Sequence, residues 1–250
     1  MASGFGLIRA ERAVLLACAA AVTLAAWIWL AGAAISLMPA HAHVHTGWRG
    51  YLATVAMWQA MMVAMMMPAV LDWLFTFASL VERSAGPRRG LRSAAAFASG
   101  YFAIWLGYSA LAALLQMALA QTHLLESEGR LPARLGGAVL IAAGLAYFTP
   151  FQRACLTHCR NPLTYFLARW NGGPRGGFGL GLTHGGYCVG CCWMLMITGF
   201  AVGVMNLLWM AALTVLICIE KLAPRGERIG AVAAVAMTVA GLVMLVWPQV

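Results

Sequence analysis

The most specific chemical pattern in this sequence places one imidazole and three thiols inside an apolar stretch, His184-Gly185-Gly186-Tyr187-Cys188-Val189-Gly190-Cys191-Cys192. On a helix with 3.6 residues per turn, the four side chains fall within an arc of about 100°. Thiolate and imidazole ligands suit a soft or borderline metal ion. Ionisable residues inside a membrane segment usually have a function. We therefore interpret His184, Cys188, Cys191 and Cys192 as one metal site; simple packing and a redox-active vicinal pair are the alternatives.

A second cluster is Cys155-Leu156-Thr157-His158-Cys159-Arg160. If this segment is helical, Cys155, His158 and Cys159 share one face at positions i, i+3 and i+4. The arginine beside them favours thiolate, which is the form that binds metals. The pattern predicts a metal site at the inner end of the fourth apolar segment. The alternative is a loop with ordinary reduced thiols.

Methionine is concentrated in the second apolar segment, at positions 57, 61, 62, 65, 66 and 67, and Pro68 follows. Met57, Met61 and Met65 are spaced four residues apart and would form one stripe along a helix. Thioethers are soft ligands that select Cu(I), so we expect these three residues to bind it. Methionine also fills gaps in apolar cores, which is the competing interpretation.

Two further segments carry weaker signals. His41, His43 and His45 alternate along the loop after the first apolar run, where three imidazoles could capture a metal such as zinc or copper. A solvated loop that tolerates histidine is the alternative. In the sixth run, Asn206 and Met210 could complete a metal site, whereas Glu220 and Lys221 could pair and reach the membrane interface.

The chain that positions these residues has the composition of a membrane protein. It is 63% hydrophobic and 9% charged, with a mean hydropathy of +0.83, whereas soluble domains are about a quarter charged. We expect an all-α, single-domain protein with seven transmembrane helices, since each run approaches the roughly 20 residues that span a bilayer. The runs are Ala13–Met38, Leu52–Val81, Ser93–Ala120, Pro132–Phe151, Gly177–Phe200, Val202–Ile219 and Ile229–Trp247.

The glycines of the fifth run make two predictions about its surroundings. Gly177, Gly181 and Gly185 are four residues apart, which lets a neighbouring helix approach closely. Only the segment from Gly199 to Gly203 separates the fifth run from the sixth, so we expect a tight, uncharged connection there.

The basic residues predict the orientation. With the N-terminus inside, thirteen Arg and Lys residues fall in inner segments and three in outer segments, as the positive-inside rule requires. The net charge of +9 is then explained by the loops, and we expect no nucleic-acid partner. The triplet Ala40-His41-Ala42 resembles a signal-peptide cleavage site. However, the preceding apolar run is about twice the usual 7–15 residues, which favours an uncleaved first span.

Nearly the whole chain resembles a bacterial family of predicted metal-binding integral membrane proteins of unknown function. The resemblance rests on four segments, namely Met57 to Pro68, Cys155 to Pro162, Gly185 to Trp193 and Met205-Asn206-Leu207. It implies a helical fold, an association with metal and a place in a bacterial inner membrane.

We therefore expect a multi-pass protein that binds and passes a soft transition metal, foremost Cu(I), with zinc as the second candidate. The predicted ligands form a series across the bilayer, and permeation or transfer requires such a series of sites that each release the ion. The expected partners are lipid, the metal ion, and a metal chaperone or membrane enzyme. No Walker loop is present, so we expect no nucleotide-driven pumping. A membrane thiol–disulfide oxidoreductase and a non-catalytic membrane subunit are the alternatives.

Overall fold

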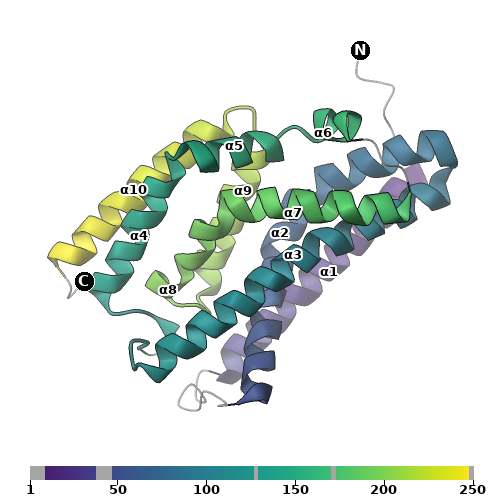
Figure 1. The fold of residues 1–250 in the computed structure, drawn as a ribbon. Helices are drawn as coiled ribbons and strands as arrows, with labels where there is room; N and C mark the ends of the chain where they lie inside the picture. Colours follow the sequence, from purple (N-terminus) through teal and green to yellow (C-terminus); the bar gives the residue numbers. More distant parts are fainter. Residues whose placement is uncertain (1–8, 38–46, 127–128, 170–172, 248–250) are drawn as a thin grey trace.

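The computed structural model describes residues 9–37, 47–126, 129–169 and 173–247, and the regular elements in these ranges are helices. Figure 1 shows their arrangement. In chain order they are α1 (Arg9–Leu37), α2 (Trp48–Ala85), α3 (Pro87–Gln121), α4 (Ala133–Tyr147), α5 (Pro150–Cys159), α6 (Pro162–Ala168), α7 (Pro174–Ile197), α8 (Gly199–Val202), α9 (Leu207–Leu222) and α10 (Gly226–Val246). The all-α prediction is confirmed for the described residues.

Much of the outer surface of these helices is apolar. Ile28, Leu208 and Val232 are 71%, 82% and 70% exposed. Within the described residues, α1, α2, α3, α7 with α8, and α10 give 5 segments that are long and apolar enough to cross a membrane. Helices α4 and α5 pass the same test together but meet at a bend of 67°. The 16 residues of α9 extend about 24 Å, less than the roughly 30 Å of hydrocarbon in a bilayer.

The centre of the molecule consists of α2, α3 and α7, with α3 packed against both of the others (Figure 1). The glycines of α7 face α3, as predicted. A Cβ atom added at Gly177 would lie 2.7 Å from the Ser93 carbonyl oxygen, and one at Gly185 would lie 3.0 Å from that of Tyr101. At Gly181 it would collide with the backbone of Phe97. The absent side chains therefore allow α7 to approach α3 closely enough to bury its thiols.

This close approach predicts a position-specific effect on stability. Gly181→Ala forces α3 and α7 apart, and overpacking of this kind typically costs about 1–3 kcal/mol. Gly179→Ala is the matched control, because a Cβ there meets no atom within 4 Å. Thermal unfolding in detergent should show a lower Tm for Gly181→Ala and an unchanged or higher Tm for Gly179→Ala. Equal effects of the two changes would contradict the close packing.

Helices α4 and α10 form a second unit at one side of the molecule, again through glycine. A Cβ added at Gly137 of α4 would lie 2.7 Å from the carbonyl oxygen of Gly241 in α10. Helix α9 contacts both α2 and α10 and so connects the two units (Figure 1). The α7–α9 connection is short, as predicted, and contains α8 and Gly203 at φ 117°. The Asn206 side chain then caps α9 by accepting a hydrogen bond from Trp209 N at 2.9 Å.

Each of the seven predicted runs coincides with one main helix. The number of spans is a separate question, because α9 is short and α4 meets α5 at a sharp bend. The predicted helix Pro132–Phe151 in fact ends at Tyr147. Pro150 lacks an N–H donor and disfavours helical geometry in the residue before it. Thr149 caps the new helix α5 by accepting from Gln152 N. This break turns α5 away from α4 and lays it beside α7.

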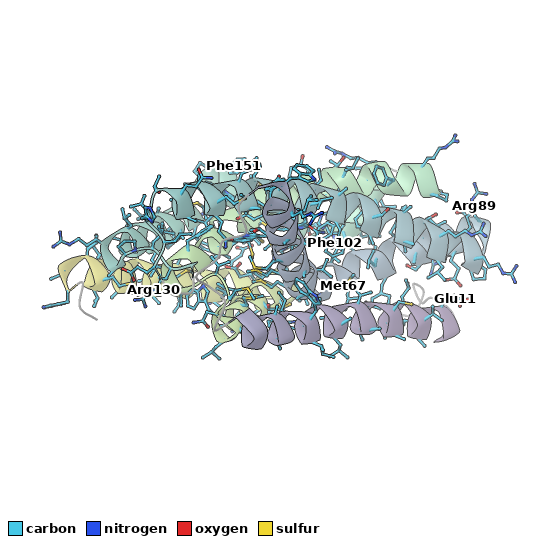
Figure 2. The ribbon with its side chains drawn as sticks, turned by 90° about the horizontal axis from the view of Figure 1, so that it is seen from below. Glu11, Met67, Arg89, Phe102, Arg130 and Phe151 are labelled. Atoms are coloured by element: carbon cyan, nitrogen blue, oxygen red, sulfur yellow. The ribbon has the colours of Figure 1, made fainter. Side chains whose placement is uncertain are left out.

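Three charged residues mark opposite ends of the molecule. In Figure 2, Glu11 and Arg89 lie at one end of the molecule and Arg130 lies at the opposite end. Arg89 belongs to a segment predicted to be inside, and Arg130 to one predicted to be outside.

Candidate metal site

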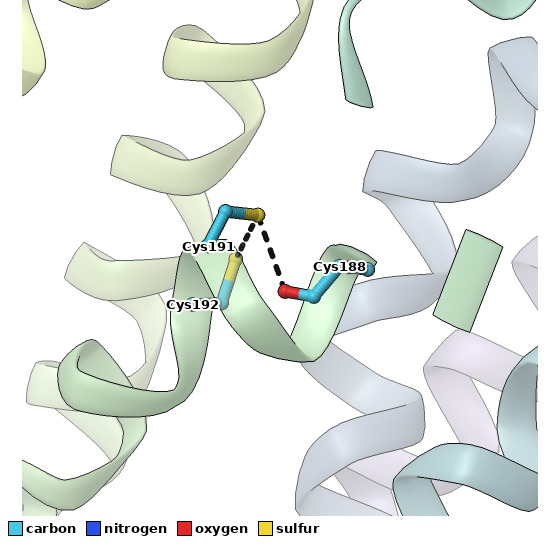
Figure 3. Close-up of side chains that lie close together, drawn as sticks. All are labelled: Cys188, Cys191 and Cys192. Atoms are coloured by element: carbon cyan, nitrogen blue, oxygen red, sulfur yellow. Dashed lines mark hydrogen bonds between the residues drawn. The ribbon is translucent and has the colours of Figure 1, made fainter. Parts of the chain in front are cut away.

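Three cysteine side chains of α7 converge in the interior. The Sγ atoms of Cys188, Cys191 and Cys192 all lie within 4.8 Å of one another. The exposed fractions of these residues are 0%, 4% and 1%. The Cys191 Sγ lies 3.4 Å from that of Cys192 and 3.1 Å from the Cys188 carbonyl oxygen (Figure 3). This is the one group of three or more potential metal ligands among the described residues.

Helix α5 adds a fourth thiol from another part of the chain. The Sγ of Cys159 lies 3.7 Å from that of Cys191, and Cys159 is 2% exposed. The indole N–H of Trp73 in α2 donates to the Cys159 carbonyl oxygen at 3.0 Å. This bond fixes the end of α5 against the centre of the molecule. The sulfur cluster, defined here as Cys159, Cys188, Cys191 and Cys192, therefore draws on two helices and is held by a third.

A buried ammonium group lies against this cluster. Lys221, at the end of α9, is 9% exposed, and its Nζ donates to Cys188 Sγ at 2.9 Å. The Tyr101 hydroxyl lies 2.9 Å from the same sulfur. Among the described residues, Lys221 has no carboxylate within the 4.0 Å of a salt bridge. An uncompensated buried charge is very unfavourable, so a thiolate in the sulfur cluster is the anion that Lys221 is placed to balance.

Glu220, the neighbour of Lys221, points elsewhere. A Cβ added at Gly230 of α10 would collide with the Glu220 carboxylate and with the Tyr147 hydroxyl. Glu220 therefore lies between α4, α9 and α10, and its carboxylate does not pair with Lys221. The interpretation that these two residues pair with each other is wrong, because successive helical residues point about 100° apart.

Arg160 connects the two helices that supply Cys159 and Lys221. Its guanidinium donates to the carbonyl oxygens of Glu220 and Ala223, the latter at 2.8 Å. These carbonyls lie at the C-terminus of α9, where helical acceptors lack intrahelical partners. The sequence suggested that Arg160 acts on the nearby thiols; in the structure it instead docks the end of α5 on the end of α9.

His184 lies outside the group of three thiols, although it occupies the same helix. Its ring stacks on Trp73 with a centroid distance of 3.6 Å and lies 5.4 Å from the Tyr101 ring. His184 is 2% exposed, and its Nδ1 atom has no hydrogen-bond partner. The structure therefore places an imidazole within an aromatic stack one turn before Cys188, and its role as a ligand stays a prediction.

The predicted Cys155–His158–Cys159 site separates into three different contacts. Cys155 packs against α7, where a Cβ added at Gly190 would lie 2.8 Å from its Sγ. The His158 ring stacks on Tyr187 at 3.8 Å, and its Nε2 atom is buried without a partner. Cys159 joins the sulfur cluster. Helix α5 is present as predicted, but its shared face packs along α7 and brings only Cys159 to the cluster.

The remaining predicted ligands are not part of the sulfur cluster or fall outside the described residues. Met61 and Met65 are buried in α2, at 4% and 1% exposure, while Met57 is half-buried. The predicted collecting site at His41, His43 and His45 falls outside the described residues.

The chemistry of the sulfur cluster is that of a soft-metal site. Thiolates bind Cu(I) strongly, and a set of four sulfurs also suits tetrahedral zinc. A family model described as "PpoB2: Copper chaperone" matches residues 55–244. The chain belongs to this family. No curated protein and no solved structure matches it.

Membership of the copper chaperone family, together with the thiol group, assigns the protein to copper-related metal handling. The matched region contains all four residues of the sulfur cluster and Lys221. The sequence pattern indicated the three thiols of α7 but gave no metal-site role to Lys221. A single lysine beside a glutamate at the end of an apolar run is typical of a membrane boundary, so only the fold identifies its contact with Cys188.

Proposed function

We propose that this protein binds Cu(I) at the sulfur cluster inside a bacterial inner membrane and passes it to an acceptor. The observation that carries the proposal is the group of three buried sulfurs within 4.8 Å of one another, with the Lys221 ammonium against one of them. A Cu(I) ion held by two thiolates carries one negative charge, which this ammonium balances. Zinc is the second candidate ion, because three or four thiolates also satisfy it.

Delivery or transport, rather than thiol–disulfide exchange, is supported by the burial of the thiols. Exchange requires an incoming sulfur to reach the attacked one, yet each residue of the cluster is at most 4% exposed. A monatomic ion needs far less room than a protein thiol. The acceptor in this proposal is a metal chaperone or a membrane enzyme.

The proposed placement is a bundle of seven spans with the N-terminus in the cytoplasm. Six of these spans are supported by the five long apolar segments and the bent α4–α5 pair, and the short helix α9 would be the seventh. The orientation is supported by the distribution of basic residues. In this orientation Pro174 lies at the inner end of α7 and Ile197 toward the outer side. The thiols of α7 then lie in the second half of that helix, where Lys221 from the end of α9 meets Cys188.

The proposed copper site is tested by a matched pair of triple variants. In detergent-purified protein loaded with Cu(I) under reducing conditions, Cys188→Ala/Cys191→Ala/Cys192→Ala should lower the bound copper by about one ion per chain, because its soft ligands are removed. Cys18→Ala/Cys155→Ala/Cys218→Ala removes three cysteines outside the cluster and should retain it. Elemental analysis gives the stoichiometry.

The same experiment separates the alternatives. Equal copper retention by both triple variants would overturn the sulfur cluster as a copper site and favour a non-catalytic subunit. Retention of zinc alone, unaffected by added Cu(I), would assign the cluster to zinc. An oxidoreductase predicts a disulfide that reforms after each turnover, which thiol alkylation before and after oxidation would detect.

The proposed topology predicts the locations of two segments. A reporter that is active only after export should be active when fused after Val250 and inactive when fused near Arg88, because Arg88 lies in a basic inner segment. A reporter that is active only in the cytoplasm should give the opposite pattern. Cytoplasmic activity at the C-terminus would exclude seven spans.

A further inference from the structure

A small cavity lined by methionine lies between α2, α7 and α9. Its volume is about 10 Å³, and five of its ten lining residues are methionines, namely Met61, Met62, Met65, Met196 and Met210. Three come from α2, one from α7 and one from α9. Met61 and Met65 were predicted to share one stripe, but their meeting with Met196 and Met210 was not predicted, because only the folded chain brings these three helices together.

Apart from the methionines, the residues that line the cavity provide few polar groups. The described residues around the cavity include no charged side chain. The one indole N–H, that of Trp209, donates to Thr198 Oγ1 at 3.1 Å. The carbonyl oxygens of Gly199 and Gly203 already accept backbone hydrogen bonds. A buried water needs two to four polar partners, so this cavity is poorly suited to water.

The volume of the cavity limits which ligands could fit inside it. A space of about 10 Å³ is close to the lower limit for one water molecule. It excludes a hydrated ion and any organic ligand, but it admits a bare monatomic ion whose hydration shell has been replaced by sulfur. Neutral thioethers bind soft monovalent ions and bind hard cations poorly. The five methionines are 0–4% exposed, so such an ion would be shielded from solvent.

The cavity continues the sulfur cluster along α7. Met196 follows Cys192 by four residues and lies on the same face, about 6 Å farther along the helix axis. Both residues are buried, at 3% and 1% exposure. Helix α9 contacts both places in the opposite chain order, because Met210 lines the cavity and Lys221 contacts Cys188. The methionine cavity and the sulfur cluster therefore lie next to each other, and α7 and α9 both contribute to each of them.

We propose that this methionine cavity is a second soft-metal site that exchanges Cu(I) with the sulfur cluster. This inference rests on the proposed copper function and extends it. The methionine site has no counter-charge and only neutral ligands, so it holds the ion weakly and releases it readily, as a transfer path requires. In the proposed orientation it lies on the outer side of the cluster. Met57 is not among the lining residues and has no part in this site.

The test uses Ag(I), a soft monovalent ion that does not undergo redox cycling, in a background without the sulfur cluster. The cluster-free protein used here has all seven cysteines changed to Ala, because Cys18, Cys155 and Cys218 are also free thiols that would bind Ag(I). It should still bind about one Ag(I) per chain through thioethers. Adding Met61→Leu, Met65→Leu and Met210→Leu should abolish this binding. Adding instead Met66→Leu, Met67→Leu and Met237→Leu should not, since these three buried methionines do not line the cavity.

Leucine matches methionine in volume and apolar character, so both sets of changes preserve packing and differ only in which sulfurs they remove. No Ag(I) binding in the cluster-free background, or equal binding by the two methionine sets, overturns the second site. If the cluster-free protein does not fold, the same two sets are compared in the wild-type chain, where only the cavity set should lose about one Ag(I) per chain. Failure of the sulfur cluster itself is read separately, from the cysteine variants with all methionines intact.

Discussion

Lys221→Met should lower the affinity for Cu(I) by about two to three orders of magnitude. The Lys221 ammonium lies 2.9 Å from Cys188 Sγ and balances the charge of a metal–thiolate complex in a buried site. Removing one partner of a buried charge pair costs about 3–5 kcal/mol, and each 1.4 kcal/mol is tenfold in affinity. Methionine retains most of the volume, and its added thioether would if anything raise the Cu(I) affinity, so a loss of affinity reports on the missing charge. Competition with a Cu(I) chelator of known affinity measures it.

The neighbouring residue supplies the control. Glu220 is also buried, at 3% exposure, but its carboxylate lies toward Gly230 and Tyr147 rather than toward the sulfur cluster. Glu220→Gln removes a charge one position away on the same helix and should leave the Cu(I) affinity unchanged. A similar loss of Cu(I) affinity in both variants would mean that copper binding requires only an undisturbed α9. That result would contradict a specific role for the Lys221 ammonium.

Stability without metal separates charge compensation from a packing role. If Lys221 served only to hold α9 against α7, Lys221→Met would lower the Tm of the metal-free protein. In the metal-free variant the Cys188 thiolate can take up a proton, so no unpaired buried charge remains, and replacing a buried ion pair by neutral groups is often neutral or stabilising. The metal-free Tm should therefore stay the same or rise. The increase in Tm on adding Cu(I) should shrink, because tight binding stabilises the folded state in proportion to the logarithm of affinity.

The sequence predicted those features of the site that depend on one helix. Cys188, Cys191 and Cys192 could be placed together because helical periodicity alone fixes their relative directions. The close approach at Gly181 followed from the same periodicity and from the absence of a side chain. His184 shares that face, but its ring stacks on Trp73 of α2. This contact between two helices could not be predicted from the periodicity of α7.

Features that depend on several helices could not be predicted in this way. Cys159 and the α7 thiols were treated as two sites, because nothing in the sequence shows that the break before Pro150 turns α5 back along α7. Lys221 resembled an interfacial residue, because its contact with Cys188 spans 33 positions in the chain. The methionine stripe was partly right, since Met61 and Met65 line the cavity. The partners from α7 and α9 only become apparent in the fold.

Cys159→Ala should reduce the Cu(I) affinity by about ten- to a hundredfold, the range typical for removing a group that supports a metal site. Its Sγ lies 3.7 Å from that of Cys191, so it either binds the ion directly or hydrogen-bonds to a thiolate that does. Both roles stabilise the charged complex. X-ray absorption on the copper-loaded protein distinguishes them, because only a direct ligand lowers the number of sulfur neighbours of copper when it is removed.

Cys155 provides a close comparison, because it lies one turn earlier on the same helix, is similarly buried and also faces α7. Its sulfur packs against Gly190 instead of the sulfur cluster. Cys155→Ala creates a cavity of similar size, so any general loosening of α5 against α7 should affect both variants alike. Only Cys159→Ala should weaken copper binding. If the two variants bind equally well, α5 contributes packing alone, and the metal site consists of the three thiols of α7 with Lys221.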